Sequence, residues 1–153
     1  MAVSAESIKS FLESASVIGS VSGDKLSRFL SLYERATKTT SQITGMPGGG
    51  GSDHEAVLAS LADAVDDASK WRALAEHQRG RVQQFLSEAD IKDSFRDLLM
   101  RRYCYGEGWE IILANQSWGK ALSRRAMFYN HKKALQACAD WVNKTGKWKE
   151  EIV

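Results

Sequence analysis

The residues best suited to chemistry are a group of cations in the C-terminal third of the chain. Between Ile111 and Ala139 there is no acidic residue, but there are five basic ones. They are Lys120, Arg124, Arg125, Lys132 and Lys133. A stretch whose charged residues are all basic concentrates positive potential on one element, as binding to nucleic-acid phosphates requires. Most short charge runs are instead the solvated face of a structural helix, so the charges alone leave both interpretations open.

The order of these residues suits the reading of double-stranded DNA by a helix that begins at Ser123. Arginines near the N-terminal end of such a helix suit bidentate contacts to guanine in the major groove. The aromatic rings after them could contact a thymine methyl group or a sugar. The lysines could contact phosphates, which positions the protein on the duplex without reading the base sequence. The predicted DNA-binding residues are Lys120, Ser123, Arg124, Arg125, Phe128, Tyr129, Lys132 and Lys133.

Residues typical of metal binding are scattered along the chain. The three histidines have no cysteine or carboxylate partner at metal-ligand spacing. They are His54, His77 and His131. Of these, His131 stands beside Lys132 and is expected to contact phosphate or solvent. We therefore expect no metal site.

Catalytic motifs are not found either. The neighbouring carboxylates Asp66 and Asp67 fall on the polar face of a predicted helix, without the pocket or histidine that acid–base work would need. The glycine run 48–51 is followed by no lysine, and no strand precedes it, so it does not match a phosphate-cradling loop. We expect a protein that is not an enzyme and needs no cofactor.

Composition places the chain among ordinary soluble proteins. It has 153 residues, of which 43% are hydrophobic and 26% are charged, enough for one domain or a domain with a small module. No apolar run is long enough to span a membrane, and the N-terminus lacks a signal-peptide pattern. Cys104 and Cys138 are too few for a disulfide framework and are expected to be buried free thiols. These features favour a reducing cytoplasm.

The net charge of +2 hides a difference between the two ends of the chain. Residues 1–91 carry 9 basic and 12 acidic side chains, whereas residues 92–153 carry 12 basic and 7 acidic ones. A polyanion is therefore expected to bind the C-terminal part.

The elements that must position these residues are predicted to be helices only. Apolar residues at helical spacing predict a first helix through Ile8 and Ala15, broken at Gly19 and Gly23. A second helix is expected from Asp24, weakening in the Thr/Ser stretch 37–44. A glycine-rich linker over residues 45–52 follows.

A long central helix is predicted from Ser52, which has the capping-box spacing with Glu55. Its apolar positions step by four and three, which is a heptad seam. The seam comprises Val57, Leu61, Ala64, Ala68, Trp71, Ala75, Gln78, Val82, Phe85 and Ala89. It could pack on the preceding helix in a hairpin or on a second subunit in a homodimer, and the short linker favours the hairpin.

The C-terminal part is predicted to be a helix-turn-helix. One helix through Phe95 and Tyr103 ends at the Gly106–Gly108 break, a short helix begins at Trp109, and a basic helix begins at Ser123. The predicted fold is thus all-α, with an N-terminal helical hairpin that includes a long central helix, followed by a C-terminal helix-turn-helix. Residues 1–90 form the hairpin and oligomerisation region and residues 91–153 the DNA-binding domain.

The stretch 99–103, then Gly106, 109–112 and 123–135, resembles the fourth region of bacterial sigma factors. It is more closely similar to the RinA/ArpU-like phage regulators of late gene transcription, which also carry a Met-Pro-Gly-Gly-Gly element, here 46–51. The resemblance covers about residues 24–140. It implies a DNA-binding transcriptional regulator of phage or prophage late operons in a bacterial host cell, with residues 123–133 as its recognition helix. Contact of the N-terminal half with host RNA polymerase is a further hypothesis, and activation and repression both stay open.

Two departures from the family pattern stand out. The connection from Leu113 to Ser123 is about four residues longer than usual, and Asn130 replaces an apolar core residue. Two alternatives therefore remain. One is a phage protein-binding module that captures host RNA polymerase, a sigma factor or a defence protein. The other is a small DNA-packaging subunit.

Overall fold

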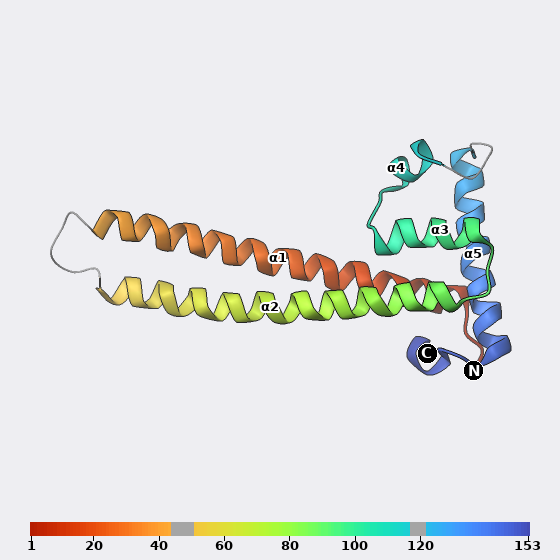
Figure 1. The fold of residues 1–153 in the computed structure, drawn as a ribbon, viewed down its shortest axis with the longest axis horizontal. Helices are drawn as coiled ribbons and strands as arrows, with labels where there is room; N and C mark the ends of the chain where they lie inside the picture. The colour runs from red at the N-terminus through yellow and green to blue at the C-terminus, as the bar shows by residue number, and fades with distance from the viewer. Residues whose placement is uncertain (44–50, 117–121) are drawn as a thin grey trace. The chain divides into compact units, whose positions relative to one another are not determined.

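The part of the chain that the structure describes is all-α, as predicted. The computed structural model describes residues 1–43, 51–116 and 122–153. Within these ranges it contains helices and no strand (Figure 1). The helices are α1 (Ala5–Ile43), α2 (Gly51–Glu88), α3 (Asp93–Leu99), the π-helix η1 (Met100–Cys104), α4 (Trp109–Ala114), α5 (Arg124–Thr145) and α6 (Lys149–Ile152). None of the helices so described is long and apolar enough to cross a membrane.

The prediction that glycines break the first helix is wrong. Helix α1 runs without interruption through Gly19 and Gly23 to Ile43. A glycine in a helix interior costs about 1 kcal/mol relative to alanine, which weakens a helix but does not end it. No proline interrupts the backbone hydrogen bonds of α1 between Gly19 and Gly23. Packing against α2 then offsets the cost of the two glycines.

Residues 45–50 of the predicted linker and Lys120 lie outside the described residues. Gly51 and Ser52 already belong to α2, so the linker is shorter than predicted and the helix begins before its expected cap residue. The side chain of Ser52 is not among those described.

The chain forms two compact units, which are described separately. Unit 1 comprises residues 1–17 and 77–153, and unit 2 comprises residues 18–76. This division differs from the boundary at residue 90 drawn from the sequence, because the first turns of α1 and the last turns of α2 belong to the same compact unit as the C-terminal helices.

The predicted heptad seam of α2 faces α1 of the same chain. Every seam residue is buried or half-buried. In unit 1, the Phe85 ring packs edge-on against Phe11 at 5.4 Å, and Gln78 Nε2 donates to Ser14 Oγ at 2.6 Å. In unit 2, Lys25 of α1 pairs with Asp67 of α2 at 2.8 Å. The helices thus form an antiparallel hairpin (Figure 1).

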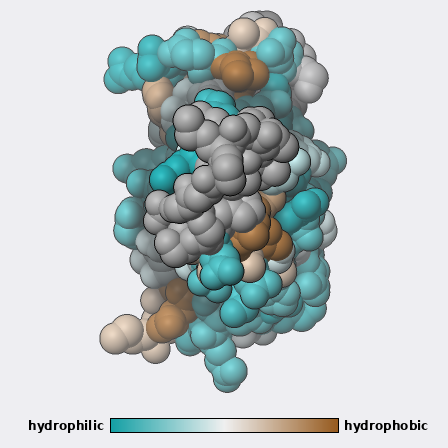
Figure 2. Space-filling model, turned by 90° about the vertical axis from the view of Figure 1, so that its left-hand side faces the viewer, coloured by the Kyte–Doolittle hydropathy of each residue, from teal (hydrophilic) through white to brown (hydrophobic). Residues whose placement is uncertain are grey.

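Unit 1 has the larger core. Apolar residues from α1, α2, η1 and α5 pack into one cluster, in which Ile8, Leu12, Phe85 and Leu86 are among the most buried. The C-terminal end closes over it through Trp148, whose ring packs on Phe85 at 5.6 Å and whose Nε1 donates to Glu88 at 2.9 Å. Hydrophilic residues make up most of the coloured surface in Figure 2.

Candidate nucleic-acid interface

A small apolar cluster holds together the three helices of the predicted helix-turn-helix. Leu98 of α3, Ile112 of α4 and Met127 of α5 are buried against one another, and Trp109 and Leu113 pack on them. Each of the three is at most 1% exposed, so the cluster is closed to solvent where the three helices meet. This cluster lies within unit 1 and supports the start of α5.

Helix α5 begins where the sequence predicts. Ser123 is its N-cap residue, and its Oγ accepts a hydrogen bond from the backbone N–H of Ala126 at 3.2 Å. This bond satisfies one of the free donors at the helix start. The Ser123 hydroxyl therefore has a structural task in the protein, and its predicted contact to DNA would come in addition.

The basic face of α5 is exposed. Met127, Ala134 and Leu135 are buried on the inner side of the helix. The residues predicted to touch DNA that the structure describes are all exposed. They are Ser123, Arg124, Arg125, Phe128, Tyr129, Lys132 and Lys133. The predicted DNA-binding residues of α5 therefore share the outer side of the helix, opposite its buried residues.

Four of these side chains also make contacts within the protein. Arg124 pairs with Glu110 of α4 at 3.1 Å, and both side chains remain exposed, at 63% and 73%. The Phe128 ring lies edge-on to Trp109 at 5.1 Å. Lys133 Nζ lies 4.6 Å from the centre of the Tyr129 ring. All three contacts leave polar or aromatic atoms facing solvent.

The expectation that His131 contacts phosphate or solvent is wrong. Its ring is half-buried, stacked on Tyr103 and edge-on to Trp109, with ring centroids 5.9 Å and 4.8 Å away. Nε2 of His131 shares a hydrogen bond with the Tyr103 hydroxyl at 2.8 Å. Burial, assisted by the positive charges of Lys9 and Arg102, lowers the pKa of His131 to about 4. The imidazole is therefore neutral near pH 7 and joins α5 to η1.

Two arginines hold α4 in position, and the sequence had assigned no role to either of them. The Arg101 guanidinium, on a side chain only 12% exposed, pairs with Glu107 at 2.6 Å and donates to the Asn115 carbonyl at 2.8 Å. It thus joins η1 to the turn before α4 and to the end of α4. Arg102 lies over the Trp109 ring at 4.5 Å. Both arginines lie outside residues 111–139, the stretch without acidic residues. The one signal in the sequence is their position just before the Gly106–Gly108 turn.

Gln116 joins the two ends of the lengthened connection. Its Nε2 donates to the carbonyls of Leu113 and Leu122 at 3.0 and 3.1 Å. Its Oε1 accepts from the Leu122 N–H at 2.5 Å. One side chain therefore joins the end of α4 to Leu122, the residue before the Ser123 cap.

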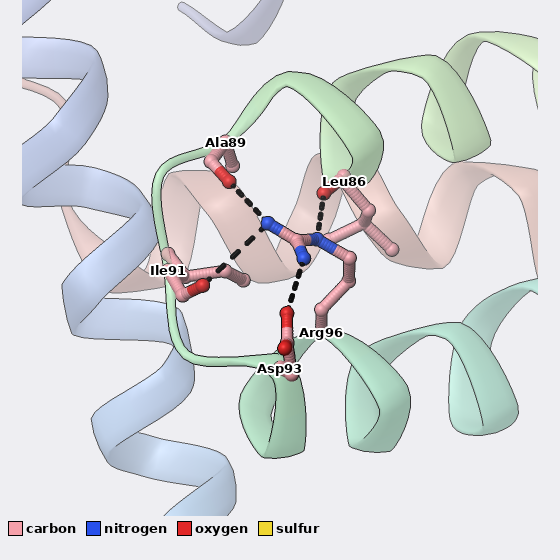
Figure 3. Close-up of polar contacts among 5 residues, drawn as sticks. All are labelled: Leu86, Ala89, Ile91, Asp93 and Arg96. Carbon is pink, nitrogen blue, oxygen red and sulfur yellow. Dashed lines mark hydrogen bonds and ion pairs between the residues drawn. The ribbon is translucent and has the colours of Figure 1, made fainter.

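The corner between α2 and α3 is held by Arg96. Its guanidinium donates to the carbonyls of Leu86 and Ala89 at 2.9 Å each, to that of Ile91 at 3.5 Å, and pairs with Asp93 at 2.8 Å (Figure 3). These carbonyls come from the end of α2 and the turn after it, where the helix dipole is negative. Arg96 therefore places α3 on the end of α2.

The substitution at Asn130 has a partial structural account. Asn130 is half-buried and faces a small pocket lined by Ser94, Phe95, Leu98 and Leu122. No fully buried polar or charged residue occurs in the described ranges. Because its amide is not completely enclosed, water can satisfy it, and the cost of a buried unpaired amide does not arise.

Within the described ranges, no three histidine, cysteine or acidic residues lie close enough to hold a metal ion.

Comparison of the chain with family models, with curated proteins and with solved structures gives no match. The chemistry of the α5 surface is therefore the basis for a functional proposal.

Proposed function

We propose that the chain is a sequence-specific DNA-binding regulator of phage or prophage transcription that reads the major groove with the first half of α5. One observation carries the proposal. Four basic side chains, Arg124, Arg125, Lys132 and Lys133, are exposed over about three turns of one helix that begins beside the apolar cluster of α3, α4 and α5. The resemblance to RinA/ArpU-like regulators supports the same function.

The ion pair of Arg124 with Glu110 is compatible with DNA binding. Both side chains are more than half exposed, and a pair of this kind contributes little to stability. A guanine edge or a phosphate can therefore replace Glu110 at small cost. In the free protein, Glu110 and the Phe128 ring, whose centroid lies 5.9 Å from the Arg124 guanidinium carbon, hold the arginine near the surface from which it would reach a base.

The proposal is tested by selecting duplexes from a random pool with the full chain and measuring affinity by fluorescence anisotropy. We expect one preferred sequence and an affinity that falls steeply with salt, since each phosphate contact releases counterions. The double variant Arg124→Ala, Arg125→Ala should bind the selected duplex at least about thirtyfold more weakly, if each arginine reads a base.

Lys144→Ala is the matched control, because Lys144 is an exposed cation on the last turn of the same helix. It should leave the affinity within about twofold of the parent. Lys132→Ala should weaken binding to all sequences alike and reduce the salt slope by about 1. If the arginine double variant binds as tightly as the parent, α5 does not read DNA. A tight complex with a host protein that survives nuclease treatment would then favour a protein-binding module.

A further inference from the structure

Glu110 of α4 places a carboxylate in contact with the basic face of α5. Its Oε1 lies 3.1 Å from Nη1 of Arg124, and both side chains are more than half exposed. An ion pair this exposed contributes little to stability. A negative charge at this place also weakens the attraction of α5 for phosphates. Neither the stability of the fold nor phosphate binding therefore explains the carboxylate.

Both side chains of this pair extend from anchored backbone. Arg124 directly follows Ser123, the N-cap residue of α5. Glu110 directly follows Trp109, which packs on the apolar cluster of α3, α4 and α5 and lies under the Arg102 guanidinium at 4.5 Å. The fold thus sets the positions from which the two side chains extend, and a site that recognises a base needs such support.

The pair presents a hydrogen-bond donor and an acceptor side by side. The Arg124 guanidinium has N–H donors on three nitrogens and contacts Glu110 through one of them, so it can hold a second partner as well. The Glu110 carboxylate can only accept, and it has acceptor sites beyond the one that faces Arg124. A ligand that binds both groups at once must offer an acceptor beside a donor at a similar spacing.

The major-groove edge of a G·C base pair offers this pattern. Guanine O6 accepts there, and cytosine N4 donates through the hydrogen that base pairing leaves unused. O6 and N4 lie about 2.9 Å apart, because they are hydrogen-bonded to each other within the base pair. That spacing is close to the 3.1 Å between the two protein atoms. A guanidinium nitrogen can therefore face O6 while a Glu110 oxygen faces N4.

An A·T base pair fits the two side chains less well. Thymine O4 and adenine N6 also place an acceptor beside a donor. Next to O6, however, guanine has a second acceptor, N7, for another guanidinium nitrogen, whereas thymine has a methyl group next to O4. The arrangement therefore favours guanine at Arg124 and cytosine at Glu110.

We propose that Arg124 and Glu110 together recognise one G·C base pair, with Arg124 at guanine O6 and N7 and Glu110 at the cytosine amino group. This inference rests on the proposed function and adds to it a specificity-determining residue on α4, outside the helix to which the base contacts are assigned above. The carboxylate repels phosphates but accepts from a base, so it favours the specific site over other DNA.

The test uses the full chain and the duplex selected from the random pool. Repeating the selection with Arg124→Ala identifies the base pair that this arginine recognises, which should be G·C in one orientation. N4-methylcytosine then replaces the cytosine of that pair, so that a methyl group takes the place of the free amino hydrogen while pairing with guanine is kept. The parent should bind the methylated duplex at least about tenfold more weakly. Glu110→Ala should bind both duplexes with nearly equal affinity.

Asp140→Ala is the matched control, since it removes the same charge from an exposed position farther along α5. It should discriminate against the methylated duplex as strongly as the parent. A base pair other than G·C at Arg124, a parent that binds both duplexes alike, or a Glu110→Ala variant that still discriminates would each overturn joint recognition. The proposed function would survive any of these results if Arg124→Ala weakens binding. If no duplex is selected at all, the proposed function fails and this inference fails with it.

Discussion

The Tyr103 hydroxyl and Nε2 of His131 lie 2.8 Å apart and form a hydrogen bond between η1 and the middle of α5. Burial raises the pKa of Tyr103 to about 12 and lowers that of His131 to about 4. Both side chains are therefore neutral near pH 7, and the bond joins two uncharged groups beneath the exposed face of α5.

This pair predicts a loss of stability in mild acid. The pKa of His131 is about 4 in the folded chain and about 6.5 in the unfolded chain, so the unfolded state binds the proton more tightly. The contribution of neutral His131 is fully present above the unfolded pKa and is lost as pH falls toward the folded one, by at most about 1.4 kcal/mol per pH unit. Denaturant unfolding between about pH 6.5 and pH 5 measures it, in a range where few carboxylates titrate.

His131→Gln should flatten that pH dependence, because an amide can still bond to the Tyr103 hydroxyl but does not titrate. His77→Gln is the control, since His77 is exposed on α2. If both variants lose stability with pH as steeply as the parent, His131 is not the titrating group.

Replacing Arg96 is predicted to lower the free energy of unfolding more than replacing any other arginine near the surface. Arg96→Met leaves the Leu86 carbonyl without its side-chain donor and removes one of two hydrogen bonds to the Ala89 carbonyl, which still accepts from the Ile91 N–H at 3.0 Å. It should lower the free energy of unfolding by about 1.5–3 kcal/mol. Chemical denaturation measures the loss. Asp93→Asn removes only the 98% exposed ion-pair partner and should leave the midpoint unchanged. An equal loss in the two variants would show that the ion pair, and not the carbonyl contacts, is what matters.

Arg101 is predicted to hold α4 in place. Arg101→Met removes the bonds to Glu107 and to the Asn115 carbonyl, so the backbone amides of α4 should exchange with deuterium at least about tenfold faster, while those of α5 remain protected. Hydrogen exchange followed by mass spectrometry gives the readout. The exposed Arg79 of α2 provides the control variant Arg79→Met, which should leave α4 unchanged. Uniformly faster exchange over unit 1 would mean that Arg101 supports the whole core.

Both cysteines are predicted to react slowly in the folded protein. Burial raises the pKa of Cys104 to about 11 and that of Cys138 to about 12. Because the thiolate is the reactive form, labelling by a disulfide reagent at mildly alkaline pH should be at least about a hundredfold slower than in denaturant. Rapid labelling of the native chain would show that unit 1 opens readily around η1.

The features that the sequence could predict are those that depend on neighbouring residues. The Ser123 cap, the inward side of α5 and the heptad seam of α2 follow from residues within a few turns of each other. The uninterrupted α1 could not be predicted, since the packing on α2 that offsets the cost of Gly19 and Gly23 is a tertiary contact. The enclosed position of His131 depends in the same way on Tyr103, 28 residues earlier.

Gln116 makes the link between α4 and α5 depend on the chemistry of one amide. Its nitrogen donates to the carbonyls of Leu113 and Leu122, and its oxygen accepts from the Leu122 N–H. Deamidation to glutamate would remove both donated bonds, because a carboxylate can only accept. A single spontaneous modification at this side chain would therefore weaken the link.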